Sequence, residues 1–82
     1  MFYKIKKVEP LKNLELKIQF ISGEIKYYDV KKLIEKYSLF KDLLNEELFS
    51  KVKVDEGGYG ISWNENIDIS CNELWEKSYY RE

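Results

Sequence analysis

The sequence contains no histidine and only one cysteine, Cys71. Without histidine the chain lacks the usual general base, the commonest metal ligand and the side chain that titrates near neutral pH. With one cysteine it can form no internal disulfide and cannot supply the pair of thiolates that many zinc sites use. We therefore expect no enzyme activity and no catalytic, cofactor-binding or metal-binding residue.

Long apolar runs are also missing. No stretch approaches the roughly 18 apolar residues that mark a membrane-spanning helix. The first lysines of the chain are not followed by the apolar segment of a secretory signal. We expect a soluble, cytoplasmic protein that does not bind membranes.

Arginine is scarce as well, because Arg81 is the only arginine beside thirteen lysines. This composition weakens the case for specific recognition of bases or phosphates, which normally draws on the guanidinium fork. Net charge is −1 overall, but residues 1–41 hold ten lysines and five acids, whereas residues 42–82 hold four basic residues and ten acids. Such a bipolar chain favours either self-association or an acidic partner.

Aromatic residues are abundant: seven Tyr, four Phe and two Trp in 82 residues. A chain of this length makes a single domain, predicted over residues 1–82, and buries only about 60–65% of its unfolded surface. Large rings help to build a small core, and they are also enriched at the centres of protein interfaces. Composition alone does not separate these two uses.

Alternating apolar residues predict three strands in the first third of the chain, over residues 3–9, 14–20 and 24–28. A bulge near Lys6–Lys7 would bring the first strand into phase, and Pro10 should end it because proline donates no backbone hydrogen bond. Ser22–Gly23 is a turn signal. These strands form a meander with one solvated face.

Helical spacing follows over residues 30–37, with Asp29 as the expected N-cap. Ser38 is a second possible cap, and Asn45 interrupts the pattern before residues 46–50. We expect two short helical pieces in this region rather than one long helix.

A β-hairpin is predicted over residues 52–63, with a glycine-bearing turn at 55–60. A phosphate-binding loop is the weaker interpretation of this turn, because two acids precede the glycines and a strand follows. Ser70 and Glu73 have capping-box spacing, which predicts a last helix with Leu74, Trp75 and Tyr79 on one face. The fold class is therefore α+β: an antiparallel β-meander plus a second β-hairpin, with three short helices packed on the sheet.

The ordered motifs of the chain resemble the family of domains of unknown function numbered 2442. The motifs are Phe20-x-x-Gly23-Glu24, Tyr28-Asp29-Val30, Leu48-Phe49, Val52-x-Val54-Asp55, Gly58-Tyr59-x-Ile61-x-Trp63, Asp68-Ile69 and Glu73-Leu74. Members often have Trp-Pro-x-Gly-Ala-Asp where this chain has Trp63-Asn-Glu-Asn-Ile-Asp68.

The resemblance implies a small bacterial α+β domain without an established activity. Some longer members carry a helix-turn-helix after this domain, and we expect that part to be absent because the sequence stops at Glu82. Genes of the family often neighbour a second small gene, which implies a toxin–antitoxin-like pair or another paired-partner role.

Two alternatives to a protein-interaction role stay open. The first is an enzyme that uses carboxylates alone, for which Asp55, Glu56, Asp68 and Glu73 would have to converge. The second is a nucleic-acid-binding or transcription-regulatory accessory domain, in which aromatic rings stack on bases while lysines 4, 6, 17 and 26 follow the backbone. A solvated sheet face explains the same lysines.

We favour a protein-interaction module that binds a protein partner or a second copy of itself. Its expected surface consists of Tyr28, Tyr59, Trp63, Trp75 and Tyr79. Trp63 is alternatively a central core residue. Cys71 is expected to be a small residue without a catalytic role. Residues 78–82 are expected to form a frayed end.

Overall fold

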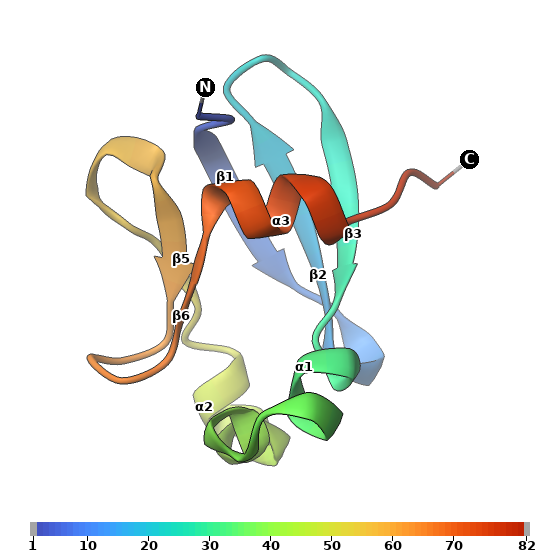
Figure 1. The fold of residues 1–82 in the computed structure, drawn as a ribbon, viewed down its shortest axis with the longest axis vertical. Coiled ribbons are helices and arrows are strands. Elements are labelled where there is room, and N and C mark those ends of the chain that lie inside the picture. The colour runs from blue at the N-terminus through green and yellow to red at the C-terminus, as the bar shows by residue number, and fades with distance from the viewer. Residues whose placement is uncertain (1, 82) are drawn as a thin grey trace.

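The computed structural model of the chain, which describes residues 2–81, contains two three-stranded antiparallel sheets and several short helices. Figure 1 shows one sheet formed early in the chain, a helical segment below it and a smaller sheet formed later. The predicted α+β fold class is confirmed. Within residues 2–81, no helix has both the length and the apolar character that crossing a membrane requires.

The first sheet has the predicted meander order, β1 (Ile5–Pro10), β2 (Glu15–Phe20) and β3 (Ile25–Asp29). The register shifts between Ile5 and Lys7, which confirms the predicted bulge, and β1 ends at Pro10. The second strand begins one residue later than predicted because Lys12–Leu14 form a 3-10 turn. One face of this sheet is buried and the other, which includes Lys7 and Glu9, is open to solvent.

Three short helical pieces follow, rather than the two predicted: α1 (Lys31–Lys36), the 3-10 helix η2 (Ser38–Leu44) and α2 (Glu46–Phe49). The break at Asn45 is confirmed, since its side chain accepts the amide of Leu48 and so caps α2. The cap of α1 was predicted one residue early. Val30 is the N-cap, although the Asp29 carboxylate accepts the amide of Lys31 at 3.0 Å.

The predicted hairpin is present, but it is part of a second sheet of three strands: β4 (Lys53–Val54), β5 (Gly60–Ser62) and β6 (Asp68–Ser70). The turn between β4 and β5 holds the 3-10 segment η3 (Glu56–Gly58). Gly58 has φ +80°, and a Cβ there would lie 2.7 Å from the carbonyl oxygen of Ile5. Glycine is therefore required at this contact between the two sheets.

The last helix, α3 (Cys71–Lys77), packs its buried Leu74 into the core. The Ser70 hydroxyl accepts the amide of Glu73, as the capping box predicts. Tyr79 is not part of the helix, contrary to the prediction. It forms an isolated antiparallel bridge with Tyr27 of β3, so the segment 78–81 is not a frayed end.

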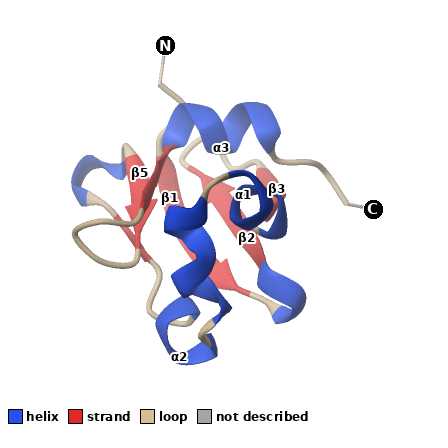
Figure 2. Cartoon of the chain, turned by 60° about the horizontal axis from the view of Figure 1, so that its bottom comes forward, coloured by secondary structure: helices blue, strands red, loops and turns tan. Residues whose placement is uncertain are grey.

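A single apolar cluster joins both sheets to the helices. In the turned view of Figure 2, α1 and α3 lie in front of the strands of the first sheet. Trp63 belongs to this cluster, with 5% of its surface exposed and its indole N–H donating to the Phe49 carbonyl at 3.1 Å. The fully buried side chains include Leu16, Ile18, Phe20, Val30, Leu43, Ile61, Ile67, Cys71 and Leu74.

Candidate interaction groove

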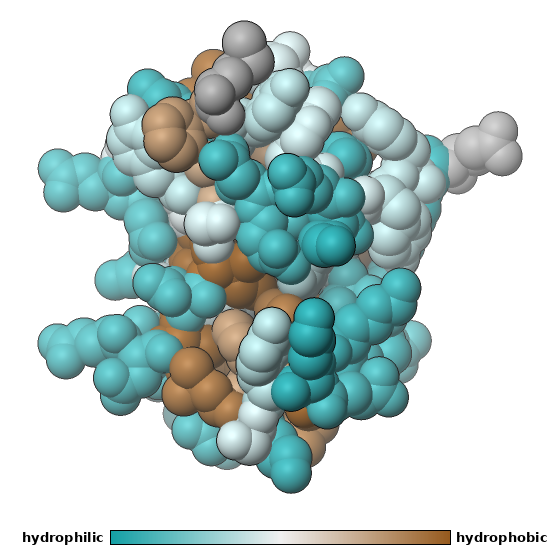
Figure 3. Space-filling model, in the orientation of Figure 1, coloured by the Kyte–Doolittle hydropathy of each residue, from teal (hydrophilic) through white to brown (hydrophobic). Residues whose placement is uncertain are grey.

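An open groove of about 740 Å³ separates α1 and η2 from α3 and β6. Figure 3 shows apolar side chains at the surface in this hollow, below a more polar upper part of the molecule. The two sides of the groove come from segments about 35 residues apart in the sequence. The lining residues are Tyr28, Asp29, Lys32, Leu33, Lys36, Tyr37, Phe40, Asp68, Ile69, Ser70, Glu73, Glu76, Lys77 and Tyr79.

The apolar part of the groove consists of side chains that also belong to the core or pack against it. Phe40 and Ile69 are buried, and Leu33 is half-buried against the same cluster. Tyr37 is 49% exposed, and its ring lies 6.3 Å from that of Phe40. A partner side chain placed here would therefore contact a preformed apolar surface.

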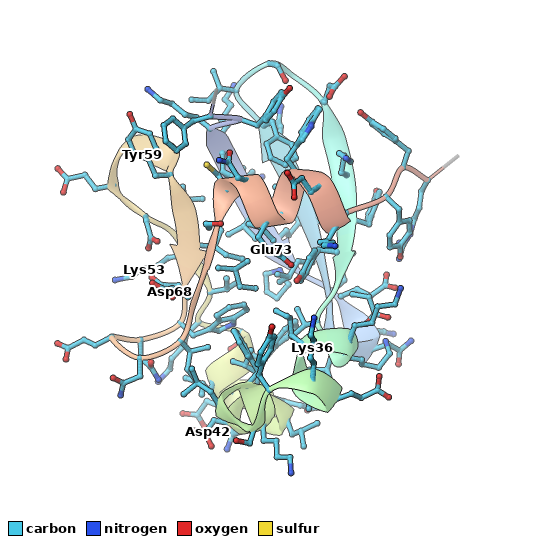
Figure 4. All side chains as sticks on the ribbon, viewed as in Figure 1. Lys36, Asp42, Lys53, Tyr59, Asp68 and Glu73 are labelled. Carbon is cyan, nitrogen blue, oxygen red and sulfur yellow. The ribbon has the colours of Figure 1, made fainter. Side chains whose placement is uncertain are left out.

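Charged side chains border this apolar part, mainly basic on the α1 side and mainly acidic on the β6 and α3 side, with Asp29 and Lys77 as the exceptions. Lys32 and Lys36 come from α1, whereas Asp68 comes from β6 and Glu73 and Glu76 come from α3. Figure 4 shows Lys36 and Glu73 on opposite sides of the space between α1 and α3. None of the ion pairs formed within residues 2–81 joins the two sides. Lys32, Lys36, Asp68 and Glu76 make no ion pair within these residues, whereas Glu73 accepts the Tyr28 hydroxyl.

The phenol of Tyr28 forms the polar centre of the groove. Its hydroxyl donates to Glu73 Oε2 at 3.5 Å, and only 3% of the residue is exposed. Burial, followed by the charge of Glu73, raises the pKa of Tyr28 above the ordinary value, so the phenol remains a neutral donor. The Glu73 carboxylate thus contacts Tyr28, and the capping-box bond from this carboxylate back to the Ser70 amide is not formed.

The five residues predicted as an interaction surface do not share one face. Tyr28 and Tyr79 line the groove, whereas Trp63 lies in the core. Tyr59 lies on the far hairpin, 49% exposed, with its ring 5.3 Å from that of Phe2. Trp75 is half-buried and stacks on Tyr3 at 4.0 Å.

The four carboxylates considered for acid–base work or metal binding do not converge. Asp68 and Glu73 line the groove, but Asp55 accepts the Ser62 hydroxyl at 2.6 Å in the second sheet and Glu56 lies in its turn. Within residues 2–81, no three Asp, Glu or Cys side chains are placed to hold a metal ion together. Cys71 is buried, as expected of a quiet core residue.

Of the four lysines expected on the solvated face of the sheet, Lys26 is on the buried face instead. Lys26 points into the buried side of the first sheet, with 7% exposure, and its ammonium donates to the Trp75 carbonyl at 2.6 Å. It also lies 4.3 Å from the Trp75 ring centre. Lys26 therefore stabilises the end of α3 and is not available to a phosphate backbone.

The α1 and η2 side of the groove was not predicted from the sequence. The apolar residues at helical spacing over residues 30–37 include Leu33 and Tyr37, and such a stripe predicts a buried face. The one available signal was the breadth of that stripe, which continues through Leu39 and Phe40 to Leu44. It exceeds what such short helices can bury, and Tyr37, Leu39 and Leu44 are all exposed.

The chain matches a family of proteins of unknown function. The profile of the DUF2442 family, described as a protein of unknown function, matches residues 5–80. The chain belongs to the DUF2442 family. This membership confirms the resemblance found in the motifs. A search of curated proteins gave no match.

This DUF2442 chain is similar to a solved structure, the crystal structure of a "putative DNA binding protein" from Nitrosomonas europaea ATCC 19718. Its TM-score is 0.71 at 23% sequence identity. The match covers 88% of this chain and 47% of the other, so this chain spans about half the length of that protein. At this identity the likeness establishes a shared fold.

Proposed function

We propose that this DUF2442 domain is a cytoplasmic protein-interaction module that binds its partner in the groove between α1–η2 and α3. We propose further that the partner is a second small protein, such as the product of a neighbouring gene in a toxin–antitoxin-like pair. The observation that carries this proposal is the groove itself, an apolar surface bordered by lysines of α1 and by acids of β6 and α3.

The composition of the groove supports a protein partner. Specific interfaces combine an apolar centre with a polar rim that carries hydrogen bonds. Here Leu33, Phe40 and Ile69 supply the centre, and the neutral hydroxyl of Tyr28 supplies a fixed polar group. Exposed Tyr37 is the kind of side chain that often dominates binding energy.

The separation of charge supports a defined orientation of that partner. A segment bound along the groove would place acidic side chains toward Lys32 and Lys36, and basic ones toward Glu73 and Glu76. Complementary charges of this kind select the partner and accelerate its association. The wrong orientation would bring like charges together.

Charge reversal at matched positions tests this proposal. Lys36→Glu changes the groove, whereas Lys41→Glu makes the same change on an exposed residue of η2 that does not line it. The chain is co-expressed with the neighbouring gene product, and the purified partner is titrated calorimetrically. We expect Lys36→Glu to weaken binding by about tenfold or more and Lys41→Glu by less than about threefold. Equal effects, or no complex with the unaltered chain, would overturn the proposal.

A nucleic-acid-binding role is the second candidate, which we propose because the similar structure is described as a "putative DNA binding protein". The burial of Lys26 and the alternation of Lys7, Glu9 and Lys17 on the open sheet face give it less support. An electrophoretic shift of DNA whose affinity falls steeply with salt would favour this candidate over the groove.

We also propose that the chain is not an enzyme. The separation of Asp55 and Glu56 from the groove acids supports this. Turnover of any substrate at a rate that depends on Asp68 or Glu73 would contradict it.

A further inference from the structure

The outer strand β3 of the first sheet is covered by the segment that follows α3. The amide of Tyr27 donates to the Tyr79 carbonyl at 2.7 Å, and the amide of Tyr79 donates to the Tyr27 carbonyl at 2.8 Å. Figure 1 shows the chain passing from α3 to the side of β3. Residues 78–81, here called the C-terminal segment, thus act as a short fourth strand.

Side chains of the C-terminal segment alternate between the two faces of the sheet, as strand residues do. The Tyr79 hydroxyl donates to Glu15 Oε2 at 2.8 Å, and Arg81 pairs with Glu15 and lies 4.1 Å over the Tyr27 ring. These contacts are on the open face of the sheet.

Tyr80 occupies the opposite side. Its hydroxyl donates to Glu24 Oε2 at 3.0 Å, and its ring lies 5.0 Å from the Lys26 ammonium. The edge of β3 therefore binds one aromatic side chain on each face, Tyr79 and Tyr80, and the basic side chain of Arg81 beside them. Glu15 and Glu24 provide the acidic partners.

The C-terminal segment pairs with only part of the outer edge of β3. One bridge joins the C-terminal segment to β3 within residues 2–81. In this antiparallel register Arg81 lies opposite Ile25, where no second bridge forms and where Ile25 is 40% exposed. A strand that continues in register past this position would gain backbone hydrogen bonds and apolar contact that the C-terminal segment does not make.

We infer that the β3 edge is a strand-addition site for an extended segment of a partner protein, with aromatic side chains on both faces followed by a basic residue. The C-terminal segment is its resting occupant and is displaced on binding. This inference rests on the proposed function, because it adds a second contact to the same protein partner. Tyr79 also borders the groove, so the two contacts adjoin.

The full chain carrying Tyr79→Pro tests the inference. Proline removes the amide that donates to Tyr27, and Ser78 already has the extended backbone that a following proline requires (φ −81°, ψ 166°). The matched control Tyr79→Phe keeps that amide and loses only the hydroxyl. The probe is a labelled synthetic peptide with the sequence of residues 76–81, titrated into each full-length protein and followed by the NMR signals of β3.

Tyr79→Pro should bind the peptide about tenfold or more tightly than the unaltered chain, because the internal competitor is weakened. Tyr79→Phe should stay within about threefold of the unaltered chain. A peptide carrying Arg81→Glu should lose most of the binding. Amide exchange at Leu16 and Ile18 reports whether the core remains folded, and amide exchange at Tyr27 should quicken in Tyr79→Pro and slow again with peptide.

Equal peptide affinity in all three proteins would overturn the inference, as would equal binding of the Arg81→Glu peptide. Formation of a Tyr79→Pro dimer that exchanges the segment between copies would also overturn it, since the occupant would then be a second copy. None of these results depends on the native partner. Failure here therefore leaves the comparison of Lys36→Glu with Lys41→Glu as a separate test of the groove.

Discussion

Replacing Trp63 by alanine should remove a large part of the stability of this fold. Trp63 is 5% exposed, stacks on Phe49 at 6.2 Å and donates its indole N–H to the Phe49 carbonyl. Truncating a buried tryptophan costs about 3–5 kcal/mol. The buried Phe49 carbonyl also loses its donor, which costs about 1–3 kcal/mol. The loss for Trp63→Ala should therefore lie near the upper end of the range of about 3–5 kcal/mol.

The magnitude is decisive for a chain of this size. A domain of 82 residues has a free energy of unfolding of about 4–12 kcal/mol. Trp63→Ala should therefore lower the urea midpoint by at least about 2 M, or leave the chain largely unfolded in buffer. Circular dichroism during urea unfolding measures the change.

Two comparison variants make the test specific. Trp63→Phe keeps a ring beside Phe49 and loses the hydrogen bond, so it should cost about 1–2 kcal/mol. Tyr59→Ala removes an aromatic residue of the same hairpin that is 49% exposed, and it should cost less than about 1 kcal/mol. A loss below about 1 kcal/mol for Trp63→Ala would refute the assignment of Trp63 to the core.

The remaining predictions concern two buried polar side chains. Burial and the charge of Glu73 raise the pKa of Tyr28, so the folded chain keeps a proton that the unfolded chain releases above about pH 10. Stability should be complete below that pH and should fall above it, by up to about 1.4 kcal/mol per pH unit. Tyr28→Phe should reduce this fall in urea unfolding at pH 8 and 11, and an unchanged fall would contradict the assignment. Lys26→Met should cost about 1–3 kcal/mol because the Trp75 carbonyl loses its donor. Lys17→Met, on the open face, should cost less than about 0.5 kcal/mol, and equal losses would disprove the role of Lys26.

Local sequence signals predicted the elements that depend on neighbouring residues. The bulge at Lys6–Lys7, the end of β1 at Pro10 and the cap at Ser70 each follow from backbone chemistry within a few positions. Gly57 and Gly58 of the hairpin turn adopt positive φ, as expected of such a turn.

Contacts between distant segments were not predictable in the same way. In residues 24–28, apolar and polar side chains allow either face to be buried, and the pairing of Ile18 with Lys26 decides that the lysine turns inward. The four residues of the C-terminal segment are too few to give a strand signal, although Tyr79 pairs with Tyr27 in the sheet. The groove likewise exists only because the fold places α1 and α3, which are distant in sequence, on its two sides.

Hydrogen–deuterium exchange of the chain, alone and in complex with the co-expressed neighbouring gene product, tests the central claim most directly. A groove-binding module predicts a stoichiometric complex in which exchange slows in residues 31–44 and 68–77. Protection confined to the open face of the first sheet, or a chain that remains monomeric and alone, would contradict the proposal.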